Sequence, residues 1–203
     1  IAVDKYGRMF AWGNNDYGQL GNGTLTKTDI PVQITGITEK VISIAAYANH
    51  TMAVTCNGTV YGFGNNANFQ LGNSQNIYQN VPIAVDDISN ATMVTTGNIS
   101  TSILLDNGEV HVFGNNNASK TQVASNMVYI DQGLAHTALL SADKELYTLG
   151  NNSKGQLGTG DFASSGAPVK VMEDVIDIGA GYNNTYGIMR DGTVWGAGEN
   201  TYG

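Results

Sequence analysis

The feature that most constrains the fold of this chain is a glycine that ends a strand-like apolar run and recurs along the whole sequence. The runs read Ala-Trp-Gly, Gly-Phe-Gly, Val-Phe-Gly, Thr-Leu-Gly and Gly-Ala-Gly, and they end at Gly13, Gly64, Gly114, Gly150 and Gly198. The intervals between these glycines are 51, 50, 36 and 48 residues. A recurring period of this length indicates a repeat protein, in which each repeat is one supersecondary unit that packs on its neighbours.

Three of the repeats share a short loop motif and a proline at constant distances. The motif ends eight residues after the strand-ending glycine, and the proline follows at eighteen residues. The residues concerned are Gln19, Leu20 and Gly21; Gln70, Leu71 and Gly72; Gln156, Leu157 and Gly158; and Pro31, Pro82 and Pro168. Because proline cannot donate to an interior ladder, we expect the proline segments at blade edges or at strand starts.

Each repeat also contains two strand-like runs around a tight turn, as at Asn57-Gly58, Asn107-Gly108 and Asp191-Gly192. Asn-Gly and Asp-Gly are strong hairpin signals because a type I′ turn needs positive φ at both central residues. A third strand precedes each hairpin, and the proline segment supplies a fourth. Four strands of about five residues in each repeat predict the blade of a β-propeller.

The full pattern resembles the repeats of the regulator of chromosome condensation family. It reads Gly-x-Val-Tyr/Trp-x-x-Gly-x-Asn-x-x-Gly-Gln-Leu-Gly and follows a His-Thr pair at His50 and His136. The resemblance covers the whole chain and implies a seven-bladed propeller in complete members. The expected fold class is therefore all-β, with about four four-stranded blades in a partial, open arc of such a propeller.

The repeat limits follow from the same pattern. We expect a single repeat domain over residues 1–203, with blades at roughly 1–29 (partial), 30–80, 81–120, 121–166 and 167–203 (partial). The chain begins and ends inside a repeat, so we expect it to be a fragment of a longer chain. Open blade edges make self-association of such a fragment a further expectation.

The third repeat departs most from the pattern. After Gly114 it keeps three asparagines and then lacks about ten residues, among them the Gln-Leu-Gly turn. The missing loop alters one face of the propeller. Two explanations stay open, a pocket for a partner and simple sequence drift.

The composition argues against nucleic acid and membranes as partners. The formal net charge is -8 and only nine residues are Lys or Arg, whereas phosphate backbones and anionic bilayers attract basic surfaces. No run approaches the roughly 18 apolar residues of a spanning helix, so no membrane insertion is expected. The asparagine-rich, lysine-poor repeats are typical of a bacterial member, which favours an extracellular or cell-surface location.

Histidines offer no catalytic pattern. His50 and His136 occupy the same slot of their repeats, where other repeats carry Ser100 and Asn184. This alternation indicates a hydrogen-bonding position inside the repeat rather than a metal ligand or an acid–base group. His111 lies in a strand of the third hairpin without a companion.

Other chemistry is equally sparse. Neither Cys56 nor any serine has the sequence context of a nucleophile, and no phosphate-binding loop is present. Two acidic pairs follow proline segments, at residues 86–87 and 173–174; solvated turns explain them, with a calcium site as the alternative. We expect no enzyme, no catalytic residue, no cofactor and no metal.

The leading functional hypothesis is a non-catalytic protein-interaction scaffold, because a propeller presents variable loops on a rigid frame. Aromatic side chains are good contact anchors because they bury much area at low entropic cost. The candidate contact residues are Tyr17, Tyr47, Phe69, Tyr78, Phe162, Tyr182 and Tyr202. The partner is a protein of unknown identity.

Three alternatives remain. The best-known members of the family are guanine nucleotide exchange factors for small GTPases, but only the fold analogy supports this activity here. A secreted bacterial propeller that resembles the family inhibits β-lactamases. Glycan binding by asparagine-rich and aromatic loops is the third alternative, although the aromatic residues do not recur at one loop position in every repeat.

Overall fold

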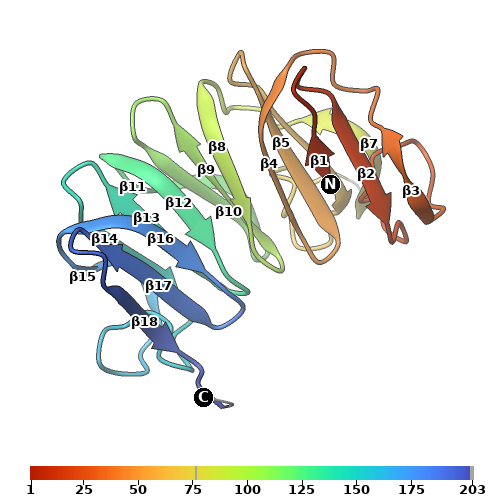
Figure 1. Cartoon of the computed structure of the whole chain (residues 1–203). Helices are drawn as coiled ribbons and strands as arrows, with labels where there is room; N and C mark the ends of the chain where they lie inside the picture. The colour runs from red at the N-terminus through yellow and green to blue at the C-terminus, as the bar shows by residue number, and fades with distance from the viewer. Residues whose placement is uncertain (76, 202–203) are drawn as a thin grey trace. The chain divides into compact units, whose positions relative to one another are not determined.

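The computed structural model describes residues 1–75 and 77–201, which form antiparallel β-sheets without a helix (Figure 1). The chain divides into two compact units, one of residues 1–106 and 111–121, the other of residues 107–110 and 122–203. The single repeat domain expected over residues 1–203 stays a prediction. No helix in the described ranges has the length and apolar character needed to cross a membrane. The all-β prediction is confirmed.

The first unit holds three sheets, in which strands that follow each other in sequence lie side by side. The first sheet contains β1 (Ala2–Val3), β2 (Met9–Gly13) and β3 (Thr28–Gln33). The second contains β4 (Val41–Tyr47), β5 (His50–Thr55), β6 (Val60–Asn65) and β7 (Tyr78–Ala84). The third contains β8 (Ala91–Thr96), β9 (Ser100–Leu105), β10 (Val110–Gly114) and β11 (Asn117–Ala124). The ends of β10 and β11 belong to the second unit.

The second unit holds two sheets of the same design. One contains β12 (Met127–Gln132), β13 (His136–Ser141), β14 (Leu146–Gly150) and β15 (Ser165–Met172). The other contains β16 (Val175–Ala180), β17 (Asn184–Met189) and β18 (Val194–Gly198). The three complete sheets therefore have the four strands predicted for a propeller blade.

The core of the first unit lies between consecutive sheets. Met52 and Val54 of β5 belong to the same buried cluster as Val94 of β8 and Ile103 of β9. Leu71 of the Gln-Leu-Gly motif joins this cluster with no exposed surface. A buried side chain of this size stabilises the fold by about 1.5–3 kcal/mol, so the motif leucine is a core residue supplied by a loop.

Each proline lies in the outer edge strand of its sheet, as predicted: Pro31 in β3, Pro82 in β7 and Pro168 in β15. The sheets nevertheless differ from the expected blade limits. In the second sheet Ile83 pairs with Gly62, so the proline strand closes the sheet that precedes it instead of opening the next one. The reason is local, because the chain returning from each loop meets the free edge of the strand that it has just left.

The third sheet has a much shorter outer connection. Residues 66–77 link β6 to β7, whereas only Asn115 and Asn116 link β10 to β11. Their φ angles are 51° and 66°, and a type I′ turn needs positive values at both positions. Asparagine tolerates this region better than most residues. The missing residues are thus replaced by a tight, regular turn.

Candidate functional site

A buried asparagine shapes each long loop. The Asn66 side chain is 1% exposed, and its Nδ2 donates to the carbonyl oxygens of Asn73 at 3.2 Å and Gln75 at 2.9 Å. Its Oδ1 accepts the backbone N–H of Leu71 at 2.9 Å. The same role is filled in the other long loops by Asn15 and Asn152. Because one internal side chain sets the loop, its outward-facing residues are free to vary.

A histidine and a threonine tie neighbouring sheets together. In the first unit the Thr101 hydroxyl donates to the Gln70 carbonyl oxygen at 2.7 Å, and His50 Nε2 lies 3.1 Å from the same hydroxyl. Since the hydroxyl hydrogen is already used, Nε2 of His50 carries the ring proton. The second unit repeats this arrangement with His136, Thr185 and Gln156.

The environment of these histidines keeps them neutral. Burial lowers the pKa of His50 from 6.5 to about 4, and burial also lowers the pKa of His136. Each side chain is 1% exposed, so neither ring meets solvent. Both histidines form a hydrogen bond, as predicted, but its partner lies in the next sheet rather than inside the same repeat. In the described part of the chain, no group of three His, Cys, Asp or Glu side chains is arranged to hold a metal.

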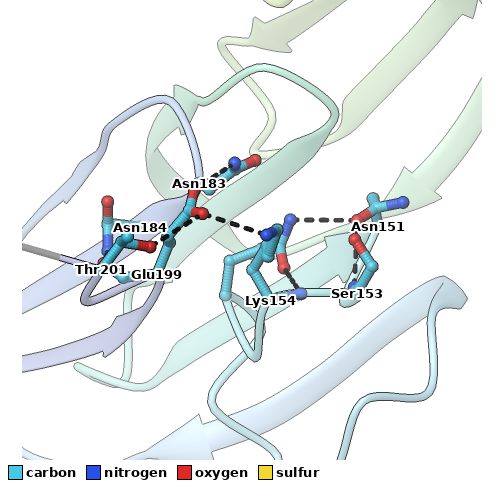
Figure 2. A network of polar contacts seen from close by, with 8 residues as sticks. Asn151, Ser153, Lys154, Asn183, Asn184, Glu199 and Thr201 are labelled. Carbon is cyan, nitrogen blue, oxygen red and sulfur yellow. Dashed lines mark hydrogen bonds and ion pairs between the residues drawn. The ribbon is translucent and has the colours of Figure 1, made fainter.

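Figure 2 shows a polar network in the second unit that joins the end of β18 to the loop after β14. Glu199 Oε1 lies 3.0 Å from Lys154 Nζ, and Oε2 accepts a hydrogen bond from Asn183 Nδ2 at 2.9 Å. The Glu199 carbonyl oxygen accepts Asn184 Nδ2 at 2.8 Å, and Thr201 donates to Oε1 at 3.2 Å. The bonds from Asn183 and Lys154 hold the pKa of Glu199 below its usual range. The carboxylate is therefore ionised and fixed in place at neutral pH.

This network forms one side of an open hollow of about 520 Å³. Two aromatic side chains line the hollow, Tyr182 and Tyr186, with 61% and 47% of their surface exposed. The other lining residues are Asn183, Asn184, Glu199, Asn200 and Thr201. The hollow combines exposed aromatic rings with amide and carboxylate groups held in fixed positions, a composition that suits recognition of another molecule.

The predicted contact residues fall into three groups. Exposed side chains are Tyr17, Tyr78, Phe162 and Tyr182. Half-buried side chains are Tyr47 and Phe69. Tyr202 lies outside the described residues. Only Tyr182 lines the hollow of the second unit, and a partner contact for any of the seven stays a prediction.

Phe69 has a structural peculiarity. Its φ is 63°, whereas the equivalent positions in the other long loops are Gly18 and Gly155, each with φ 78°. A bulky residue with this φ is strained. The second long loop therefore carries an aromatic ring at a strained position where the other two long loops have glycine. This departure from the repeat keeps Phe69 among the candidate residues.

Several residues of the site were not singled out from the sequence. The organising asparagines recur two residues after Gly13, Gly64 and Gly150, and this constant offset is a signal that identifies them. The pairing of Lys154 with Glu199 has no such signal, because the two residues lie 45 positions apart and follow strands of different sheets. Tyr186 could not be identified from the sequence either, because it is a strand residue without a distinguishing motif. Its side chain is nevertheless 47% exposed in the structure.

A family model described as the regulator of chromosome condensation (RCC1) repeat matches residues 6–54, 57–104 and 143–188. A second model of the repeat matches residues 41–70 and 175–203. This chain belongs to the RCC1 repeat family. Residues 105–142 lie outside both sets of matches, and they contain the whole shortened hairpin of β10 and β11.

Similar proteins come from several eukaryotes. The ultraviolet-B receptor UVR8 of Arabidopsis thaliana is 28% identical over 98% of this chain and 51% of its own length. The regulator of chromosome condensation of Xenopus laevis is 30% identical over 75% of this chain and 40% of its own length. The RCC1-type chain described here thus spans about half the length of these relatives or less. The bacterial source and the surface location expected from composition stay predictions.

Among solved structures, Prp20p of Saccharomyces cerevisiae has a TM-score of 0.85 with 23% sequence identity. The match covers 98% of this chain and 55% of the Prp20p chain. At this level of identity the likeness shows the RCC1 propeller fold alone, and it agrees with the four-stranded blades seen here. The structure of Prp20p is described together with its binding to Gsp1p and histones.

Proposed function

We propose that this RCC1-type chain is a non-catalytic, protein-binding part of a propeller. The observation that carries the proposal is the hollow of the second unit, where Tyr182 and Tyr186 expose their rings beside a carboxylate that Lys154 and Asn183 hold in place. Rigid aromatic side chains next to fixed polar groups are typical of contact surfaces between proteins. Prp20p, which shares the fold, is described as binding proteins.

Fixing the polar groups in advance favours binding. The Lys154–Glu199 pair is partly solvent-exposed, with 48% and 32% of the two side chains accessible, so it adds little to the stability of the fold. It nevertheless orients the Glu199 carboxylate before a partner arrives. A partner then orders fewer side chains on binding, which lowers the entropic cost of association.

Affinity capture with an aromatic-deficient variant tests this function. The chain is immobilised, proteins of the source organism are passed over it, and retained proteins are identified by mass spectrometry. Tyr182→Ala combined with Tyr186→Ala should weaken the retained partner by about tenfold or more, as truncation of central aromatic anchors does. The matched control is Tyr6→Ala, because Tyr6 is 65% exposed and lies in the first unit. A partner retained equally by the double variant would contradict the proposal.

Guanine nucleotide exchange on a small GTPase is the second candidate. Its support is the 30% identity to the Xenopus regulator of chromosome condensation together with the activity that the family resemblance implies. If the captured partner is a small GTPase, release of a fluorescent GDP analogue should accelerate when the chain is added. Binding without acceleration would leave the scaffold function and remove the exchange activity.

A further inference from the structure

The outer edge of the third sheet differs from the other outer edges. A sheet edge presents unpaired N–H and C=O groups to which another strand can add. The outer strands β3, β7 and β15 each contain a proline, which lacks the N–H that an added strand would need. β11 is the outer strand of the third sheet, and its eight residues contain no proline. It is the unprotected outer edge of the first unit.

A loop of the preceding sheet also covers β7 but not β11. The Gly23 N–H donates to the Asn80 carbonyl oxygen of β7 at 2.8 Å, and Asn80 Nδ2 donates back to the Gly23 carbonyl oxygen at 2.9 Å. Pro82 packs so closely on Gly36 that a Cβ added there would lie 2.9 Å from its ring. The equivalent loop bonds only the turn before β11, where the Asn116 N–H donates to the Asn68 carbonyl oxygen at 3.0 Å. Among the described residues, no loop forms a comparable backbone bond with β11 itself. The backbone of β11 is thus accessible from the side where β7 is closed.

A hollow of about 570 Å³ lies beside this open strand, entirely within the first unit. Its walls are residues 72–75 of the second long loop, Asp86 and Asp87 after β7, His111 of β10, and residues 118–120 of β11. At the preceding junction, Val81 and Pro82 occupy the space against Gly23 and Gly36. The shortened hairpin brings no proline segment to the equivalent place, which leaves the hollow open.

The charges around the hollow favour a basic occupant. Asp86 and Asp87 are exposed, and neither carboxylate forms an ion pair with any described residue. The single ammonium group of the lining is Lys120, so the fixed charges of the carboxylates exceed it. The net charge of -8 of the whole chain acts in the same direction by attracting a basic partner.

We propose that an extended segment of a partner protein pairs with β11 as an added strand and places a lysine or arginine side chain in the hollow beside Asp86 and Asp87. Main-chain hydrogen bonds to β11 would supply affinity, and the hollow would select the side chain, as in other cases of strand addition. This surface lies in the first unit and is separate from the tyrosine-lined hollow of the second. The sequence left two explanations for the shortened repeat, a pocket for a partner and sequence drift, and this proposal adopts the first.

The decisive variant introduces the missing proline. A regular two-residue hairpin would pair Gly114 with Asn117 and Phe113 with Ala118. In that register the N–H of Ala118 would point away from β10. Ala118→Pro should remove one outward donor and leave the pairing with β10 intact. Ala118→Ser is its matched control. Lys120→Pro, with Lys120→Ser as control, serves if Ala118→Pro lowers the melting temperature of the chain.

The probe is a phage-displayed library of random peptides, selected on the whole chain and measured by fluorescence anisotropy. Selected peptides should contain Lys or Arg, and the proline variant should weaken their binding by about tenfold or more while the serine variant stays within about twofold. Asp86→Asn with Asp87→Asn should cost about fivefold at low salt, and raising the salt should shrink this difference. Asparagine accepts the φ of 59° found at Asp87.

Four results would overturn the proposal. Peptides without basic residues would remove the charge argument, and peptides that bind the proline variant unchanged would exclude strand addition. Light scattering that shows β11-dependent dimers in place of peptide binding would assign the edge to a second copy of this chain. Binding that depends on Tyr182 and Tyr186 but ignores β11 would refute this surface alone and leave the proposed function standing.

Discussion

The outer hairpins of the second and third sheets connect equivalent strands in two ways. β6 and β7 are linked by a twelve-residue loop, folded around buried Asn66 and followed by an edge strand with a proline. β10 and β11 are linked by two exposed asparagines and followed by an edge strand without proline. The long loop supplies Leu71 to the core, and β7 is itself covered by the loop of the first sheet that contains Gly23. Among the described residues, the short turn supplies no such core residue, and β11 has no such cover. The third repeat thus lacks both the long loop and the proline of the edge strand that follows it.

The largest expected difference between the two hairpins concerns their asparagines. Asn66→Ala removes the acceptor of the Leu71 N–H and the donor to the carbonyl oxygens of Asn73 and Gln75, and it leaves the buried Leu71 N–H without its partner. Each such loss costs about 1–3 kcal/mol, so the variant should lose about 4 kcal/mol of unfolding free energy. Urea denaturation measures the change. Asn117→Ala in the third hairpin is the control, since the side chain of Asn117 accepts the exposed N–H of Ser119. If Asn117→Ala lowered the unfolding free energy as much as Asn66→Ala does, the two hairpins would not differ in this respect.

The next difference is in pH dependence. His50 of the second sheet has a pKa of about 4 when folded, against 6.5 for the free side chain, and its counterpart in the third sheet is Ser100, which does not titrate. The unfolded chain takes up the proton first, so stability should fall as the pH drops below 6.5 and level off below 4. The shift corresponds to about 3 kcal/mol.

Urea denaturation at a series of pH values tests this expectation, with His50→Ser as the variant that copies the third sheet. The variant should lose most of the pH dependence assigned to His50 and retain the part that comes from His136 and the carboxylates. An unchanged slope between pH 6.5 and 4 would show that His50 titrates normally in the folded chain.

The smallest effect lies in the tight turn. Asn116 has a φ of 66°, so Asn116→Val should cost about 1–2 kcal/mol, because a β-branched residue is strained in this region. Asn116→Gly should change the unfolding free energy by less than about 0.5 kcal/mol, since glycine adopts the same φ freely. Thermal unfolding of both variants measures the difference. Equal stability of the two variants would mean that the turn is not of the type I′ form.

Much of this architecture could be predicted from the sequence, because repetition multiplies weak signals. The constant offsets of Gly64, Leu71 and Pro82 from one repeat to the next identify a strand end, a loop and an edge strand together. The short third hairpin was also evident from the spacing. What the spacing did not reveal is the sheet to which each proline strand belongs, because that depends on which neighbouring edge offers hydrogen bonds in space.

The candidate sites were less predictable. Aromatic residues in loops could be named, yet Tyr47 and Phe69 are half-buried, while strand residue Tyr186 remains exposed. Solvent exposure depends on what packs against a side chain, and sequence position alone does not reveal this. The open edge of β11 follows from the missing proline and from the lack of a loop bond to the strand itself. It was recognised only by comparison with the covered edge of β7.

The central claim is that β11 is an open docking edge whereas β7 is closed. Hydrogen–deuterium exchange of the chain with and without a selected basic peptide, read by mass spectrometry, tests it directly. The account predicts slower exchange in residues 117–124 on binding and no change in residues 78–84. Protection confined to residues 78–84 or to the tyrosine-lined hollow, with residues 117–124 unaffected, would contradict it.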